Sequence, residues 1–297
     1  MTTWTTIVNG AAGGGRCGAA ATAALDRLRD AGMTLDVRFT ERAGHATELV
    51  RAAHDGGARR FIAVGGDGTS FEVVNGLFPR AEADTVTLGF LPLGTGNSFV
   101  RDFGVTDTES AIDALVRDER RPCDVVKIVH RDGEMHYINL MSIGFSARVG
   151  ALTNRRFKPF GAAGYALAVG ASVVGLELPV YPLTIDEGDE DRRPCTLLSF
   201  SNSRYAGGTM MMAPEAEFGD GAVDVIRIDR LSRLGLLRAF PKIYKGSHIH
   251  LDQVETTRAR RVDFHDHGEV DCMIDGEIAT LSLRALEVMP GALEVVA

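Results

Sequence analysis

The sequence has 297 residues, of which 45% are hydrophobic and 24% are charged, a composition typical of globular proteins. This length is sufficient for two domains of ordinary size. The formal net charge of −8 argues against a general nucleic-acid binder, and contact with an anionic membrane would require a local basic patch.

The cysteines are scattered along the chain without a CxxC pair, at Cys17, Cys123, Cys195 and Cys272. We expect reduced thiols rather than a disulfide framework or a zinc site. The first residues lack the basic-then-apolar pattern of a secretory signal, and we therefore expect a cytoplasmic protein.

The first part of the chain alternates between strand and helix patterns. We predict strands over residues 5–9, 35–40, 61–64 and 86–91, and helices over 19–30, 44–55 and 107–117. A further helix follows Gly66, with Phe71, Val74 and Leu77 on its apolar side. This order predicts βαβ units in a parallel sheet with right-handed crossovers.

A glycine cluster, Gly65-Gly66-Asp67-Gly68-Thr69, separates the strand over 61–64 from this helix. Such a turn directs backbone N–H groups and the positive end of the helix dipole toward a bound anion, usually phosphate. Asp67 is unusual there, because a carboxylate beside an anion site requires a cation or a transferable proton. A purely structural turn is the alternative.

Two further loops follow predicted strands. Residues 10–16 are glycine-rich without a Walker-type lysine, so Arg16 is the candidate cation there. In the loop over 92–99, Thr95 and Asn97 could contact a ligand, although Asn97 could equally cap a short helix. Because ligands of parallel sheets bind beyond the carboxyl ends of the strands, we expect both loops, Thr40 and the glycine cluster to converge.

From about residue 123 the pattern changes to strands separated by turns, which predicts an antiparallel β domain. The predicted strands span 124–130, 135–142, 181–186, 195–202, 222–229, 260–265, 270–274 and 279–288. An uncharged segment over 160–176 predicts a packed helix or, alternatively, a wall of a lipid-accepting cleft. In the second case the basic residues Arg155, Arg156 and Lys158 would meet anionic headgroups.

Two acidic turns in this part carry further alternatives. The turn over 214–222 could bind a hard cation through Asp220 and nearby carbonyl groups, or it could be a simple Asp-Gly turn. Asp275-Gly276-Glu277 predicts a hairpin with two solvated carboxylates. If that turn instead faces a nucleotide, either carboxylate could act as a general base.

Three motifs occur along the chain in order: the glycine cluster with Glu72, the segment Leu93-Gly94-Thr95-Gly96-Asn97, and the turn Asp275-Gly276-Glu277. In this order and spacing they resemble the diacylglycerol kinase-type lipid kinases of bacteria. This family is related to sphingosine and ceramide kinases, and the resemblance covers nearly the whole chain. It implies an N-terminal NAD-kinase-like α/β nucleotide-binding domain (1–125) and a C-terminal antiparallel β-sandwich domain (126–297), with the active site between them.

The resemblance implies transfer of the γ-phosphoryl group of ATP, with Mg²⁺, to a lipid hydroxyl. Glu277 would be the proton acceptor with Asp275 beside it, and Asp67 is the alternative base. The magnesium loop would use Glu217, Asp220 and Ala222. The residues expected to bind ATP, including those chosen from the loops above, are Asn9, Gly10, Gly13, Gly14, Arg16, Thr40, Gly65, Gly66, Asp67, Gly68, Thr69, Glu72, Gly94, Thr95 and Asn97.

The sequence departs from the family pattern in three places. Gly10 replaces the usual proline, Ser98 replaces the usual acidic residue, and the 217–220 segment is a variant of the magnesium loop. One alternative function is a soluble-substrate kinase similar to NAD kinases, which share the glycine signature. The other is a nucleotide-binding regulator without catalysis, which Ser98 leaves open. We expect a lipid partner at a membrane surface, by peripheral contact at its inner face, with no nucleic acid and no transmembrane segment, and we leave a homodimer open.

Overall fold

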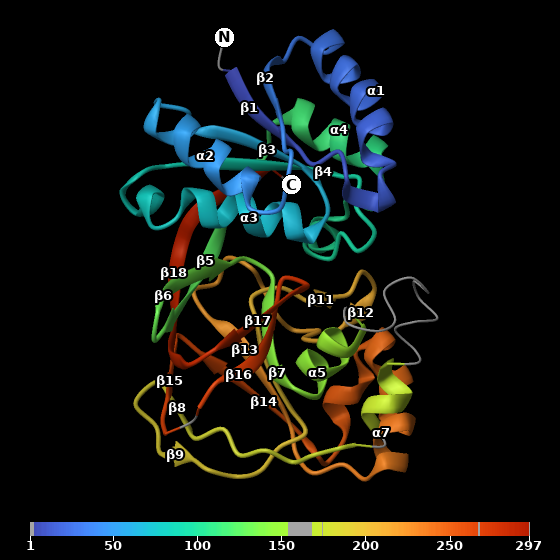
Figure 1. Cartoon of the computed structure of the whole chain (residues 1–297), viewed down its shortest axis with the longest axis vertical. Coiled ribbons are helices and arrows are strands. Elements are labelled where there is room, and N and C mark those ends of the chain that lie inside the picture. Colours follow the sequence, from blue (N-terminus) through green and yellow to red (C-terminus); the bar gives the residue numbers. More distant parts are fainter. Residues whose placement is uncertain (1–2, 154–167, 174, 267, 297) are drawn as a thin grey trace. The chain divides into compact units, whose positions relative to one another are not determined.

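The structure is a computed structural model that describes residues 3–153, 168–173, 175–266 and 268–296 (Figure 1). The chain forms two compact units. The first comprises Met1–Val125 together with Met289–Ala297, and the second comprises Val126–Val288. The last residues therefore return to the first unit, which the division into 1–125 and 126–297 did not anticipate.

The first unit contains a parallel sheet, as its alternating pattern predicted. Its strands lie in the order β2 (Thr34–Phe39), β1 (Thr3–Val8), β3 (Arg60–Gly65) and β4 (Thr87–Pro92). The end of β18 (Leu283–Val296) adds a further parallel strand beside β4, with Glu294 opposite Thr87. The central strands are buried nearly throughout, as expected for a parallel sheet covered on both faces.

The helices of this unit follow the strands: α1 (Cys17–Asp30), α2 (His45–Asp55), α3 (Asp67–Leu77) and α4 (Thr108–Arg117). Three short 3-10 segments accompany them: η1 (Ala12–Gly14), η2 (Arg80–Ala83) and η3 (Phe99–Phe103). Figure 1 shows α2 and α3 side by side, and Gly76 permits this contact because a Cβ there would lie 2.7 Å from the Cβ of Val50. Asp107 caps α4 in a reciprocal pair with Ser110.

The second unit contains an antiparallel six-stranded sheet, as the turn-separated strands predicted. Its strands lie in the order β14 (Val254–Ala259), β13 (Val223–Ile228), β10 (Leu197–Ser201), β7 (Leu140–Gly144), β16 (Val270–Ile274) and β17 (Glu277–Leu281). Further antiparallel pairs join β15 (Arg261–Phe264) to β18 and β8 (Leu183–Ile185), β8 to β9 (Glu190–Asp191), β5 (Arg120–His130) to β6 (Gly133–Tyr137), and β11 (Tyr205–Ala206) to β12 (Met210–Met211).

One core cluster joins the six-stranded sheet to the helices of this unit. Leu197 and Ile226 of the sheet belong to it with Phe145 of α5 (Phe145–Leu152), Leu236 of α7 (Arg233–Ala239) and Ile243 of η6 (Phe240–Lys245). A short turn, η7 (Ser247–His250), follows η6. The sequence patterns did not predict α5, α7 or β14.

Two predicted strands each proved to be two. The segment over 135–142 is divided into β6 and β7 by Ile138 and Asn139, whose backbone N–H groups donate to the Asp275 carboxylate instead of a strand partner. The segment over 279–288 is divided between β17 and β18. Most of the predicted helix over 160–176 and the basic residues Arg155, Arg156 and Lys158 lie outside the described residues.

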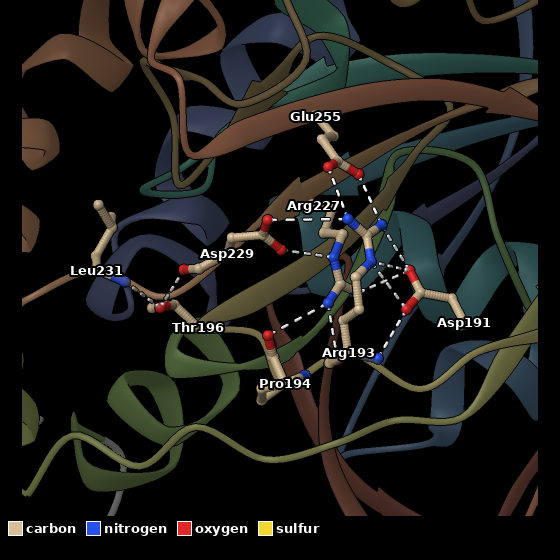
Figure 2. Close-up of polar contacts among 8 residues, drawn as sticks. All are labelled: Asp191, Arg193, Pro194, Thr196, Arg227, Asp229, Leu231 and Glu255. Carbon is tan, nitrogen blue, oxygen red and sulfur yellow. Dashed lines mark hydrogen bonds and ion pairs between the residues drawn. The ribbon is translucent and has the colours of Figure 1, made fainter.

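A buried arginine fastens the loop between β9 and β10 to the sheet (Figure 2). The Arg227 side chain is buried and donates to Asp229 (2.7 Å), pairs with Asp191 (3.3 Å) and donates to the Arg193 carbonyl (2.7 Å). Arg193 in turn forms a bidentate pair with Glu255, at 2.8 Å for both bonds. Burial alone would raise the pKa of Asp191, but hydrogen bonds from Arg193 and the nearby arginine charges lower it.

Among the helices in the described ranges, none has both the length and the apolar character needed to cross a membrane.

Candidate nucleotide-binding site

Three loops meet at the carboxyl edge of the first unit's sheet, after β1, β3 and β4. The N–H of Asn9, directly after β1, donates to the Val64 carbonyl of β3 (3.0 Å). The N–H of Gly94, after β4, donates to the Gly65 carbonyl (2.8 Å). These bonds fix the three loops at the edge where ligands of parallel sheets bind.

The loops approach one another so closely that their contact points must be glycine. A Cβ on Gly94 would lie 2.3 Å from the Gly66 Cα, and a Cβ on Gly13 would lie 2.8 Å from the Leu93 carbonyl oxygen. Gly13 also has a φ of +61°, which an L side chain rarely adopts. The floor of this edge is therefore built of backbone, and its polar groups are amides and carbonyls.

The helix α3 begins at this floor, with Gly66 as its N-cap in an extended conformation and no side-chain cap. Its first N–H groups are available to an anion, and the helix dipole favours negative charge there. Thr69 in the first turn is buried, and its hydroxyl accepts a hydrogen bond from the Asn9 amide (3.1 Å). Asn9 and Thr69 thus connect two of the three loops.

Asn97 presents an acceptor to the same place. Its φ is +51°, and its amide nitrogen donates to the carbonyls of Pro92 (3.1 Å) and Gly94 (3.0 Å). Its Oδ1 is buried and has no partner among the described residues, and it lies 3.0 Å from the position that a Cβ on Gly94 would take. The alternative role of Asn97 as a helix cap is wrong, because the N-cap of η3 is Ser98.

Asp67 is held by the residue after Asn97. Its carboxylate accepts hydrogen bonds from the Ser98 N–H (2.8 Å) and from the Ser98 hydroxyl (3.1 Å). Burial raises the pKa of Asp67, while the bonds from Ser98, the Phe99 N–H and the charge of Arg101 oppose that rise. The net effect is a raised pKa for Asp67, and perturbed pKa values of this kind are common for groups in functional sites.

Arg101 is a residue of this site that the sequence patterns did not single out. Its charge acts on Asp67, and its Nε is buried with no hydrogen-bond partner among the described residues. Such a group costs free energy unless a ligand or water accepts its hydrogen. The only signal in the sequence is a cation four residues after Asn97, which is too common to be informative.

The remaining predicted ATP residues of this unit lie around the same loops. Thr40 follows β2, and its N–H donates to the Val8 carbonyl (2.9 Å) beside Asn9. The guanidinium of the exposed Arg16 donates to the Gly13 carbonyl (2.9 Å). Thr95 is exposed at the tip of its loop. Gly10 and Gly14 belong to the loop after β1, and Gly68 lies in the first turn of α3.

Glu72 has another contact. Its carboxylate accepts the N–H groups of Gly44 (2.8 Å) and Ala46 (3.1 Å), at the start of α2. It thereby satisfies donors that the helix leaves unpaired and complements the α2 dipole. Its side chain supports the site by fixing α2 against α3.

In the second unit, Asp275 lies in the turn between β16 and β17 and Glu277 follows that turn, and the predicted hairpin is confirmed. Asp275 and Gly276 both have positive φ, 47° and 88°. Asp275 is not solvated as the simplest hairpin would predict: it is 3% exposed, and its carboxylate accepts the N–H groups of Asn139 (3.2 Å) and Leu140 (2.9 Å). Glu277 is exposed, and no hydrogen bond or ion pair involves its carboxylate in the part of the chain that the structure describes.

The predicted magnesium loop carries one engaged carboxylate. Asp220 accepts the Ala222 N–H (3.2 Å) and pairs with Arg258, while Glu217 is exposed. Within the described residues there is no group of three or more His, Cys, Asp or Glu side chains that could hold a metal ion. A cation bound in this loop would have to displace Arg258 or use carbonyl groups.

The loops of the first unit fit the phosphates of a nucleotide. They offer a helix N-terminus without a side-chain cap, a backbone floor that a Cβ would fill, and two buried polar atoms, Asn97 Oδ1 and Arg101 Nε, that have no hydrogen-bond partner among the described residues. These are the features of phosphate sites at glycine-rich strand–helix junctions.

Comparison with known proteins places both units in described families. Residues 3–128 match the family described as "Diacylglycerol kinase catalytic domain". Residues 139–297 match the family described as "YegS C-terminal NAD kinase beta sandwich-like domain". The expected combination of an α/β domain and a β-sandwich-like domain is thereby confirmed.

Similar proteins extend over nearly the whole chain. A Mycobacterium tuberculosis protein named "Diacylglycerol kinase" is 32% identical over 294 residues, which are 98% of this chain and 94% of that protein. A Chromohalobacter salexigens protein named "Probable lipid kinase YegS-like" is 30% identical over 91% of this chain and 86% of its own length. A crystal structure from Bacillus anthracis shares the fold, with a TM-score of 0.80 and 23% identity over 99% of this chain and 94% of that chain.

Proposed function

The chain belongs to the diacylglycerol and lipid kinase family, and from that premise we propose that it transfers the γ-phosphoryl group of Mg-ATP to a hydroxyl group of a lipid. The single observation that carries the nucleotide part of this proposal is the backbone contact between Gly66 and Gly94, where no side chain fits. A site that excludes side chains but offers amide groups favours a phosphate chain over an apolar ligand.

The proposed roles of the loop residues follow from their contacts. The first N–H groups of α3 would donate hydrogen bonds to phosphate oxygens at the positive end of the helix dipole. Arg101 and Arg16 would add positive charge. Asn9 and Thr69 would position two loops relative to each other, since they are already bonded to each other. Mg²⁺, when bound, would neutralise developing charge on the phosphoryl oxygens.

The proton acceptor in this proposal is Glu277. The acceptor hydroxyl would transfer its proton to the Glu277 carboxylate while its oxygen bonds to the γ-phosphorus, and the bond from that phosphorus to ADP breaks. The Glu277 carboxylate is able to accept a proton because it is exposed and forms no hydrogen bond or ion pair with the described residues. Asp275 is engaged with three backbone N–H groups and would act by positioning the turn.

Glu277→Gln tests this assignment. General-base catalysis typically contributes about 10²–10⁴-fold, so we expect phosphoryl transfer to lipid to fall by at least about 100-fold while ATP affinity stays within about twofold. Glu187→Gln is the matched control, because Glu187 is an exposed carboxylate in another turn of the same unit. If Glu277→Gln retains wild-type turnover and Asp67→Asn abolishes it, the proton acceptor is Asp67.

A further inference from the structure

The segment from α7 to η6 presents leucine, tyrosine and basic side chains together on the surface of the second unit. Its inward residues Leu236 and Ile243 belong to the core cluster. We define the basic–apolar patch by its outward residues, which are all exposed: Arg233, Leu234, Leu237, Arg238, Lys242, Tyr244 and Lys245. Because Leu236 and Ile243 pack into the core, they anchor α7 and η6, and the patch is a fixed part of the folded unit.

The apolar side chains of the patch are unusually exposed. Leu234 is 55% exposed, Leu237 49% and Tyr244 46%. They are three of the six large hydrophobic residues that are exposed in the described ranges, and they fall within eleven consecutive positions. Phe240 and Tyr244 form an edge-to-face pair at 6.0 Å, which extends the apolar surface along η6. Single exposed apolar residues are ordinary, but such a concentration marks an interaction surface.

The charge of the same segment is opposite to that of the chain. Residues 230–251 contain five of the 32 lysines and arginines and none of the 40 aspartates and glutamates. None of these five cations forms an ion pair with another residue in the described part of the chain. Unpaired cations in a protein with a net charge of −8 provide the local basic patch that contact with an anionic surface requires.

We propose that the basic–apolar patch is the surface by which this protein binds the face of a bilayer that contains anionic lipids. Leucine and tyrosine side chains enter the boundary between headgroups and acyl chains, and long basic side chains bury their stems while their charges reach lipid phosphates. A second copy of the chain is a poorer occupant. A two-fold contact would place the same unpaired cations opposite one another.

This inference deepens the proposed function and rests on it for its biological meaning, because a kinase of lipids must reach an acceptor held in a membrane. The binding itself needs neither ATP nor transfer. It is therefore measured separately, by sedimentation of the full chain with sucrose-loaded vesicles in the absence of nucleotide. The vesicles are phosphatidylcholine alone, or phosphatidylcholine with about one third phosphatidylglycerol.

We expect binding to the vesicles with phosphatidylglycerol, weakened by salt, and little binding to phosphatidylcholine alone. Each cation near an anionic surface contributes about fivefold to partitioning, so Lys242→Glu with Lys245→Glu should reduce it by at least about 25-fold. The matched control is Arg117→Glu with Arg284→Glu, two exposed arginines elsewhere without described ion pairs, which should change partitioning by less than about threefold.

The apolar contribution has its own pair of variants. Leu237→Ser should weaken vesicle binding by about fivefold, whereas Val116→Ser, at a similar exposure of 46%, should leave it unchanged. Unaltered thermal unfolding verifies that each variant is folded.

Equal binding by the patch variants and their controls would overturn the inference, and so would failure of the wild type to bind vesicles. Self-association that Leu237→Ser abolishes, without vesicle binding, would also overturn it in favour of an interface between copies. Patch-dependent vesicle binding without any lipid phosphorylation would instead refute only the proposed function.

Discussion

Replacing Gly94 by alanine tests whether the contact between the glycine loops shapes the nucleotide site. The added Cβ would lie 2.3 Å from the Gly66 Cα, 2.7 Å from the Gly66 nitrogen and 3.0 Å from Asn97 Oδ1. Ordinary contact begins at 3.4 Å. The obstacles include backbone atoms, so the two loops must separate by about 1 Å, and no side-chain rotation relieves the contact.

The cost follows from this geometry. Overpacking of this kind typically costs about 1–3 kcal/mol, which corresponds to a decrease in melting temperature of roughly 3–10 °C for a unit of this size. A displacement of about 1 Å at a site that positions phosphates can reduce its function by about 100-fold. We therefore expect ATP affinity to fall by at least tenfold while the protein remains folded.

Isothermal titration calorimetry with Mg-ATP and thermal unfolding measure these two effects. The control is Gly18→Ala in α1, where a Cβ would have no neighbour within 4 Å. Because Gly18 lies in the first turn of α1, alanine there should stabilise the protein by no more than about 1 kcal/mol and leave ATP affinity unchanged. If Gly94→Ala binds ATP as the wild type does, the contact between the loops does not form the nucleotide site.

Three further predictions concern charged groups. Burial, opposed by the nearby arginine charge, raises the pKa of Asp224 to about 6. The folded protein therefore loses stability as pH rises from about 4 to 6, where Asp224 must ionise in its buried position. In urea unfolding, Asp224→Asn should be more stable than the wild type at pH 7.5, by no more than about 3 kcal/mol, and should not be more stable at pH 4. Arg227→Met leaves Asp229 without its buried partner and should lower the free energy of unfolding by about 2–4 kcal/mol, whereas a loss below 0.5 kcal/mol would show that the network does not stabilise the fold. Ser98→Ala removes a hydrogen bond that stabilises ionised Asp67 and should raise the pKa of Asp67 further, as followed by NMR titration of its carboxyl carbon; an unchanged titration would contradict the assigned bond.

The sequence was most informative where local chemistry decides the structure. The glycine cluster after β3 predicted a strand, a turn and a helix, and Asp67 begins that helix as the motif requires. The Asp275-Gly276 pair predicted the hairpin between β16 and β17, because both positions need positive φ. In these cases the residues that determine the conformation are neighbours in the chain.

The sequence was least informative where a side chain meets a distant partner. Asp275 lies 135 residues from Leu140, whose N–H it accepts, so the pattern could not show that the carboxylate is buried. Glu72 belongs to the glycine motif, yet its carboxylate caps α2, which is visible only after α2 packs on α3. The return of β18 to the first sheet likewise depends on a pairing with β4, in which Glu294 lies 207 residues after its partner Thr87.

The central claim is that this chain phosphorylates a lipid, and transfer of labelled γ-phosphate from Mg-ATP tests it most directly. The acceptors are diacylglycerol, phosphatidylglycerol and a long-chain base in mixed micelles, with NAD⁺ as the soluble acceptor. We expect one labelled lipid product that depends on Mg²⁺ and is lost in Glu277→Gln. Labelled NADP⁺ with no labelled lipid would contradict the account and identify a kinase of soluble substrates, and ATP binding without any labelled product would identify a nucleotide-binding protein that lacks catalysis.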